Sequence, residues 1–215
     1  LNEALAAFDT AAALEPARLD AAIAPIGLLC ELGRTDEALT RCERLTAAAP
    51  GNPDIRFNTG LVHEARGDLM SALACYDVAL ERDPRHRPSL LNRGLALTRL
   101  GRREEAYANN GAAAAAFPDL ADSHYNLAEV ALALGRYADA LEHCRRGLAL
   151  DPRHPGALFD RVLALAALGR FAEAHAGLLV HGQLGAVQAG VVVQAGVPDA
   201  VLADHLRSNV AAEPD

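Results

Sequence analysis

Lysine and tryptophan are both absent from this 215-residue sequence. Without lysine there is no phosphate-binding loop that ends in Gly-Lys, no lysine Schiff base and no lysine general base. The 20 basic residues are therefore all arginines, and against 28 acidic residues they leave a net charge of −8. That sign disfavours a nucleic acid or an anionic membrane as the main partner. We expect neither.

Cysteine is also scarce, and its pattern excludes two further classes of site. The four residues show neither a C-x-x-C motif nor a Cys/His zinc spacing, so they predict neither a disulfide framework nor a metal site. His63-Glu64 lacks the second histidine of a zinc-protease helix. Because no catalytic constellation is evident, we predict no catalytic residue, no metal and no cofactor, and a chain that is not itself an enzyme.

Long apolar runs are missing as well. The longest candidate, residues 177–193, is broken by His181, Gln183 and Gln188 and is not a credible membrane span. No signal peptide is visible, and we expect a cytoplasmic protein without membrane insertion. Export stays open as an alternative, since the sequence begins at Leu1 and not at Met.

Alanine is abundant, with 47 residues, and small residues recur with a fixed period. The period is 34 residues for glycine, proline and alanine alike, which predicts an array of repeats. The recurring residues are Gly33, Gly67, Gly101, Gly135 and Gly169; Pro16, Pro50, Pro84, Pro118 and Pro152; and Ala38, Ala72, Ala106, Ala140 and Ala174.

Each repeat predicts a helical hairpin. About a dozen residues with apolar side chains at helical spacing precede the glycine, and about a dozen follow it before a proline stop. Positive φ at the glycine ends the first helix. The alanine five residues later lets the two helices approach closely, because a larger side chain would push their axes apart.

This pattern resembles the tetratricopeptide repeat over residues 1–188. The resemblance implies an all-α, right-handed α-solenoid of helix-turn-helix units, with residues 1–18 as the second helix of one repeat. Full repeats follow at 19–52, 53–86, 87–120, 121–154 and 155–188. The family's small residues are best kept in the three inner repeats, as at Gly60 and Gly147. Residues 189–215 fall out of register and are expected to form a C-terminal capping segment or the start of a downstream region.

The resemblance also implies a concave groove lined by the first helix of each repeat. One position of that helix carries an asparagine ladder, whose amides can donate to and accept from the backbone of an extended peptide. A neighbouring position is apolar. The predicted peptide-binding residues are Asn58, Asn92, Asn126 and Asp160, with Phe57, Leu91, Tyr125, Phe159, Leu61, Leu95 and Arg99. The alternative is that the asparagines bond only neighbouring helices.

Other residues are expected to be structural or solvated. His86 and His154 occupy matching "DPRH" loops and are expected in solvent, whereas Cys75, Cys144 and Tyr137 are expected in the core. Residues 82–103 contain seven arginines and one aspartate before the next acidic pair, and most are expected to be solvated or paired. Since the family's carboxylate clamp needs lysines, chaperone tails are not expected as partners.

We therefore predict a protein-interaction scaffold that binds an extended peptide or a partner helix in its groove. Two alternatives stay open. The repeats look like those that precede bacterial O-linked N-acetylglucosamine transferase-like domains, which implies a substrate-recruiting arm of a larger enzyme. A self-assembling scaffold is the other, with the groove of one copy receiving the terminal helix of another.

Overall fold

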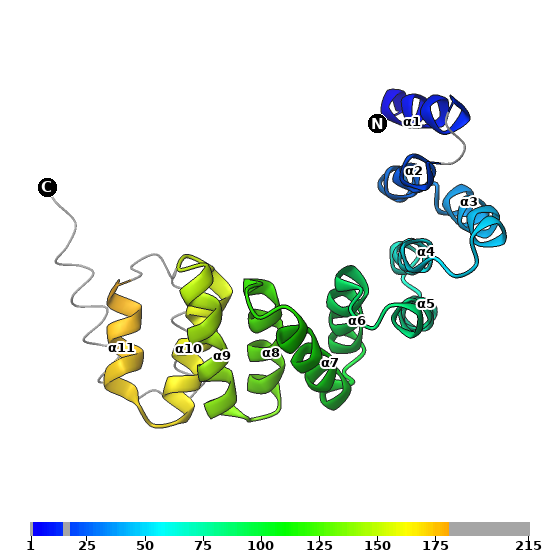
Figure 1. Cartoon of the computed structure of the whole chain (residues 1–215). Coiled ribbons are helices and arrows are strands. Elements are labelled where there is room, and N and C mark those ends of the chain that lie inside the picture. Colours follow the sequence, from blue (N-terminus) through cyan, green and yellow to red (C-terminus); the bar gives the residue numbers. More distant parts are fainter. Residues whose placement is uncertain (1, 15–17, 181–215) are drawn as a thin grey trace, which may run out of the picture. The chain divides into compact units, whose positions relative to one another are not determined.

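The computed structural model describes residues 2–14 and 18–180, and all regular secondary structure in them is α-helical (Figure 1). The predicted all-α class is therefore confirmed, while the predicted segment 189–215 lies outside the described residues. The helices are α1 (Asn2–Leu14), α2 (Leu19–Glu31), α3 (Thr35–Ala48), α4 (Pro53–Ala65), α5 (Leu69–Arg82), α6 (Arg87–Arg99), α7 (Arg103–Ala116), α8 (Ala121–Ala133), α9 (Tyr137–Leu150), α10 (Pro155–Ala167) and α11 (Phe171–Val180).

The periodic glycines have the backbone conformation that the pattern requires. At all five, φ lies between 72° and 79°. The residue after each glycine donates its N–H to the carbonyl five residues earlier, as Arg136 does to Ala131 at 2.8 Å. This bond closes the end of a helix, and a Cβ at positive φ would strain it. The glycine period is thus a requirement of the turn.

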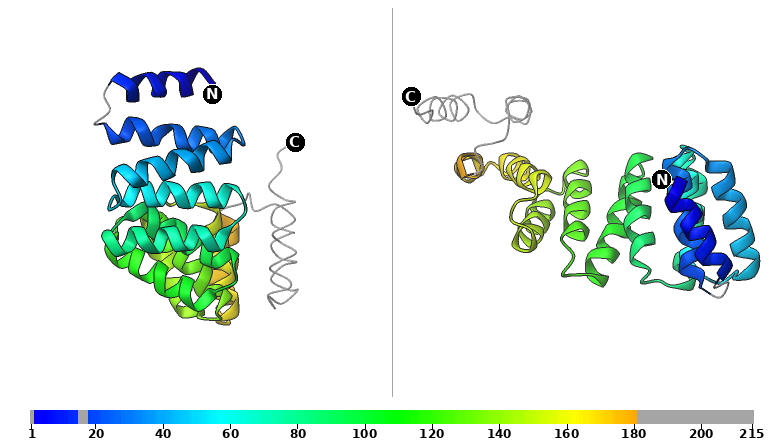
Figure 2. Two further views of the ribbon diagram at one scale, coloured as in Figure 1. Left: turned by 90° about the vertical axis from the view of Figure 1, so that its right-hand side faces the viewer. Right: turned by 90° about the horizontal axis from the view of Figure 1, so that it is seen from above.

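The chain divides into two compact units, residues 1–102 and 103–215. Unit 1 contains α1 to α6, and the described part of unit 2 contains α7 to α11. Within each unit consecutive helices pack together, and so do α2 with α4 and α8 with α10 (Figure 2). The boundary falls between α6 and α7, inside the predicted repeat 87–120, so the repeat limits stay a prediction.

Small residues allow the close packing inside each unit. Ala38, Ala72, Ala106 and Ala140 are completely buried. Gly60 lies directly beneath the Tyr76 ring, and Gly147 beneath the Tyr125 ring, so that a Cβ at either glycine would overlap the ring. Each unit therefore has a glycine–tyrosine contact in which the missing side chain makes room for the aromatic one.

The cysteines and one tyrosine test the expected core. Cys144 is fully buried and Cys75 is partly buried. The expectation for Tyr137 is wrong, because 38% of this residue is exposed. It is the first residue of α9, immediately after the turn at Gly135.

Candidate peptide-binding faces

One hydrogen bond links the start of α4 to the start of α6, the first helices of two successive hairpins in unit 1. At their N-terminal ends Asp54 Oδ1 is 3.0 Å from Nε2 of His86, the residue before α6. At their C-terminal ends, burial raises the pKa of the Glu64 carboxyl, and the nearby Arg99 opposes that rise.

Residues of α4 and α6 make up the surface that we call the unit 1 face. On each helix, residues three and four positions apart lie on the same side. The face consists of Phe57, Asn58 and Leu61 on α4 and of Leu91, Asn92, Leu95 and Arg99 on α6. Leu95 is half exposed, Arg99 is exposed, and the other five are partly buried.

The two asparagines of the unit 1 face are held in the same way. Asn58 Nδ2 donates to the Asp54 carbonyl at 2.8 Å, and Asn92 Nδ2 donates to the Pro88 carbonyl at 3.0 Å. Both bonds run to the residue four positions earlier in the same helix. Each uses one of the two amide N–H donors, and the second donor and the amide oxygen are not needed by the helix.

The apolar side chains of the face differ in how much surface they offer. The Phe57 ring lies 5.8 Å from both the Tyr76 and the His86 ring centroids, so most of its contacts are internal. Leu95, at 50% exposed, has the largest exposed fraction among the apolar side chains of the face. A ligand would therefore meet an apolar surface centred on α6.

The matching surface of unit 2, which we call the unit 2 face, consists of Tyr125 and Asn126 on α8 and Phe159 and Asp160 on α10. Tyr125 is only 6% exposed. Its ring stacks on His154 at 3.9 Å, and its hydroxyl donates to the carbonyls of Gly147 at 3.0 Å and Asp151 at 2.9 Å. Little of this side chain is available to a ligand.

The polar residues of the unit 2 face differ from those of unit 1. The backbone carbonyl of Asn126 accepts a hydrogen bond at 2.9 Å from Asn110, a buried residue of α7. Burial raises the pKa of Asp160 to about 6, and the nearby Glu129 adds to the rise. Phe159 is partly buried against the cluster around Val162 and Leu165. The structure thus places Asn58 and Asn92 on two helices of unit 1, and Asn126 and Asp160 on two helices of unit 2.

His86 is a structural residue, and the prediction that it lies in solvent is wrong. It is buried rather than solvated, because Phe57 covers one side of its ring and Asp54 binds Nε2. Nδ1 lies 2.8 Å from the Ser89 hydroxyl, which completes an Asp-His-Ser chain. The order is that of a hydrolase triad, but Ser89 is completely buried inside α6 and cannot reach a substrate. Asp54 and His86 are 32 residues apart, close to one repeat length, and this spacing was the sequence signal that could have placed them together.

Thiol and metal chemistry find little support in the described residues. Burial raises the pKa of Cys42 to about 11 and that of Cys144 to about 12, so both stay protonated near neutral pH. His124 and His143 approach with their Nδ1 atoms 3.2 Å apart, and His124 Nε2 lies 3.0 Å from the Pro118 carbonyl. No group of three or more metal-ligating side chains occurs in this part of the chain.

The chain consists of helical hairpins, each of which turns at a positive-φ glycine, and the glycines recur every 34 residues. This arrangement defines a helical-repeat protein, and the first helices of the hairpins make up its faces. Family models described as tetratricopeptide repeat match residues 28–87, 64–118, 121–154 and 155–176. The chain belongs to the tetratricopeptide repeat family, which supports a protein-interaction scaffold in general terms.

Several solved structures share this fold. PilF of Pseudomonas aeruginosa is 21% identical, with a TM-score of 0.69 over 86% of this chain and 87% of that one. MamA of Desulfovibrio magneticus RS-1 is 18% identical, with a TM-score of 0.67 over 74% and 90%. A thermophilic TPR protein of Thermus thermophilus is 28% identical, with a TM-score of 0.59 over 78% and 90%. The curated proteins give no match to this sequence.

Within residues 2–14 and 18–180, no helix combines the length and the apolar character that a membrane crossing would need.

Proposed function

We propose that this chain is a protein-interaction scaffold that binds an extended segment of a partner protein along the first helices of its hairpins. The backbone of the segment would bond to asparagine and aspartate side chains, and its side chains would pack on the apolar residues between them. The proposed contacts are Asn58, Asn92, Asn126 and Asp160, with Phe57, Leu91, Tyr125, Phe159, Leu61, Leu95 and Arg99.

The observation that carries this proposal is the matched geometry of Asn58 and Asn92. Each amide is fixed by one bond to its own helix, at 2.8 Å and 3.0 Å, so that its remaining donor and acceptor are already oriented. A peptide backbone offers one donor and one acceptor per residue. Because the side chains are ordered before binding, the entropy lost on binding is reduced. Recognition through the backbone is tolerant of the partner's side chains.

The unit 1 face contributes most to this proposal. Leu95 supplies exposed apolar surface on the same helix as Asn92, and Arg99 at the end of α6 can meet an acidic side chain of the segment. Tyr125 contributes mainly by packing, since it is buried. The enzyme-arm and self-assembly alternatives stay predictions.

Affinity capture from a lysate of the source organism tests the proposal. The chain is compared with the triple variant Asn58→Ala, Asn92→Ala, Asn126→Ala, after circular dichroism has shown that both are folded. Because three hydrogen bonds of roughly 1 kcal/mol each are lost, we expect at least a tenfold loss of the specific partner. Glu81→Ala, an exposed change on α5, is the control and should capture normally. Equal recovery by the triple variant would contradict the proposal.

A further inference from the structure

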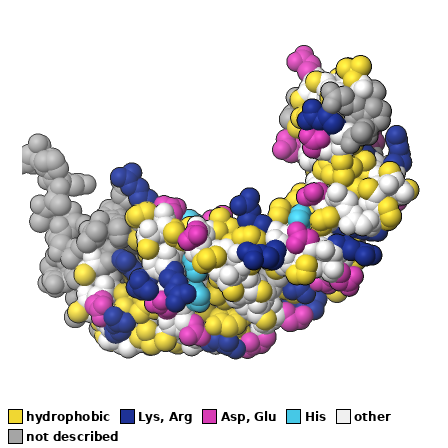
Figure 3. Space-filling view, viewed as in Figure 1, with side chains coloured by type: hydrophobic (Ala, Val, Ile, Leu, Met, Phe, Trp, Pro, Cys, Tyr) yellow, Lys and Arg dark blue, Asp and Glu magenta, His cyan; other side chains and the backbone are white. Residues whose placement is uncertain are grey.

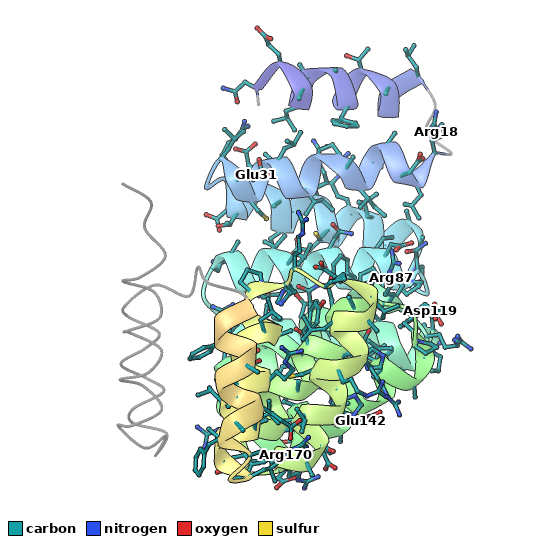
Figure 4. The ribbon with its side chains drawn as sticks, turned by 90° about the vertical axis from the view of Figure 1, so that its left-hand side faces the viewer. Arg18, Glu31, Arg87, Asp119, Glu142 and Arg170 are labelled. Atoms are coloured by element: carbon teal, nitrogen blue, oxygen red, sulfur yellow. The ribbon has the colours of Figure 1, made fainter. Side chains whose placement is uncertain are left out.

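A pocket of about 740 Å³ lies among α9, α10 and α11 of unit 2, away from the residues of the unit 2 face. Its apolar lining includes Leu141, Leu165 and Leu168. Basic and acidic side chains both lie over this part of unit 2, with hydrophobic surface between them (Figure 3). Glu142 and Arg170, two residues that line the pocket, are labelled in Figure 4.

Both carboxylates that line the pocket are already paired. Glu142 binds Arg145 at 2.9 Å and Arg146 at 2.8 Å, and Glu173 binds Arg170 at 2.7 Å. Arg161 also lines the pocket and is partly buried, yet it forms no ion pair within the described residues. The pocket therefore has an excess of positive charge beside an apolar floor.

The repeat pattern explains why Arg161 lacks a partner. Arg93 is two repeat lengths earlier and occupies the corresponding position in unit 1, where it binds Asp77 at 2.6 Å. The residue that corresponds to Asp77 is Arg145. Where unit 1 has an arginine–aspartate pair, unit 2 has two guanidinium groups on one pocket. A carboxylate between them would restore the missing partner with charge-assisted hydrogen bonds.

We propose that the pocket binds an acidic segment of this same chain, residues 199–206, through the Asp204 carboxylate. Asp204 is flanked by Leu202 and Leu206, which match the apolar floor. Residues 181–215 contain four acidic residues and one arginine, so the charges are complementary.

The length of the connection also suits this occupant. Asp204 follows Val180, the end of α11, by 24 residues, and a chain of that length can span up to roughly 80 Å, which is ample to reach the pocket. Because the segment is tethered to the pocket, its effective concentration is on the order of millimolar, so even a weak contact is substantially populated.

Limited trypsin digestion of the full chain tests the contact. Arg207 is the one arginine after Arg170, so cleavage there removes residues 208–215 and is read directly by mass spectrometry. In Arg145→Asp, the new carboxylate pairs with Arg161 as Asp77 pairs with Arg93. We expect cleavage after Arg207 to accelerate at least about threefold, the factor for a segment docked two thirds of the time.

The same variant exchanges the Arg145–Glu142 pair for a pair with Arg161, so its melting temperature should change little. Faster cleavage at an unchanged melting temperature separates release of the segment from general loosening, which would lower that temperature. Arg146→Asp is the matched control: it makes the same charge change at the next residue, which does not line the pocket, and should cleave at the original rate.

Asp204→Asn completes the test. We expect it to accelerate cleavage in the original chain and to add nothing in the Arg145→Asp background, where the segment is already released. Equal rates of cleavage after Arg207 in the original chain and in Arg145→Asp would overturn the proposal. The pocket would then bind either no segment or a segment of a partner protein. Protection that disappears on dilution would also overturn it, since the segment would then come from a second copy.

Discussion

Gly147→Ala is expected to lower the free energy of unfolding by about 3 kcal/mol. A Cβ at this position would lie 2.6 Å from Cδ1 of Tyr125. The Tyr125 ring cannot move aside easily, because His154 stacks on it and its hydroxyl is bonded to two carbonyls. Urea denaturation followed by circular dichroism measures the change.

Two other glycines serve as controls for that result. Gly60→Ala should behave like Gly147→Ala, since its Cβ would lie 2.9 Å from Cδ1 of the fully buried Tyr76. Gly111→Ala, in the middle of α7 with open space around it, should instead stabilise the chain by about 0.5–1 kcal/mol. Stability unchanged in Gly147→Ala would show that the ring does not pack as described.

Asp160→Asn is expected to raise the free energy of unfolding by about 2 kcal/mol at pH 7.5 and to change it little at pH 4. Burial raises the pKa of Asp160 to about 6 in the folded chain, whereas an unfolded aspartate titrates near pH 4. The folded state therefore binds the proton more tightly. Stability is highest below about pH 4 and falls as the pH rises through about 6.

Denaturant unfolding at several pH values, in the original chain and the variant, measures this effect. The variant should lack the decline between about pH 4 and pH 6 that Asp160 contributes. Glu129→Gln is the control and should remove a smaller part of the decline, because burial is the larger cause of the raised pKa. Parallel pH profiles for the original chain and Asp160→Asn would contradict the assignment.

Much of this fold follows from backbone chemistry that is visible in the sequence. A glycine at which φ must be positive has no good substitute, so the positions of Gly33 and its four successors locate the turns directly. The completely buried Ala38 and its equivalents follow in the same way from helix contact distance. These features depend on local geometry, which repeats with the sequence.

The environment of individual side chains could not be predicted from repeat position alone. Tyr125 and Leu91 occupy equivalent positions, yet only Tyr125 is covered by a histidine from the following loop. His86 and His154 are also equivalent, but His86 is buried by Asp54 and Phe57, whereas the His154 ring nitrogen accepts a bond from Ala157 at 3.0 Å. Each outcome depends on the particular residues of the adjacent repeat.

The missing partner of Arg161 was predictable in principle. Aligning the repeats at 34 residues places Arg145 where Asp77 stands, and this comparison needs only the sequence. What the sequence could not supply is the distance of 2.6 Å between Arg93 and Asp77, which shows that the two positions meet across adjacent helices. A contact observed in one repeat therefore shows which interaction is lost when the equivalent residue of another repeat differs.

If Asn58 and Asn92 bind the backbone of a partner segment, methylation of that backbone must interfere with binding. A synthetic peptide of the captured segment is titrated calorimetrically against the chain, with single N-methyl groups placed at successive residues and matched alanine substitutions at the same residues. We expect at least one N-methyl group to weaken binding about tenfold or more, while alanine at that residue changes the affinity little. Full affinity for every methylated peptide, with strong losses on alanine substitution instead, would contradict this mode of binding.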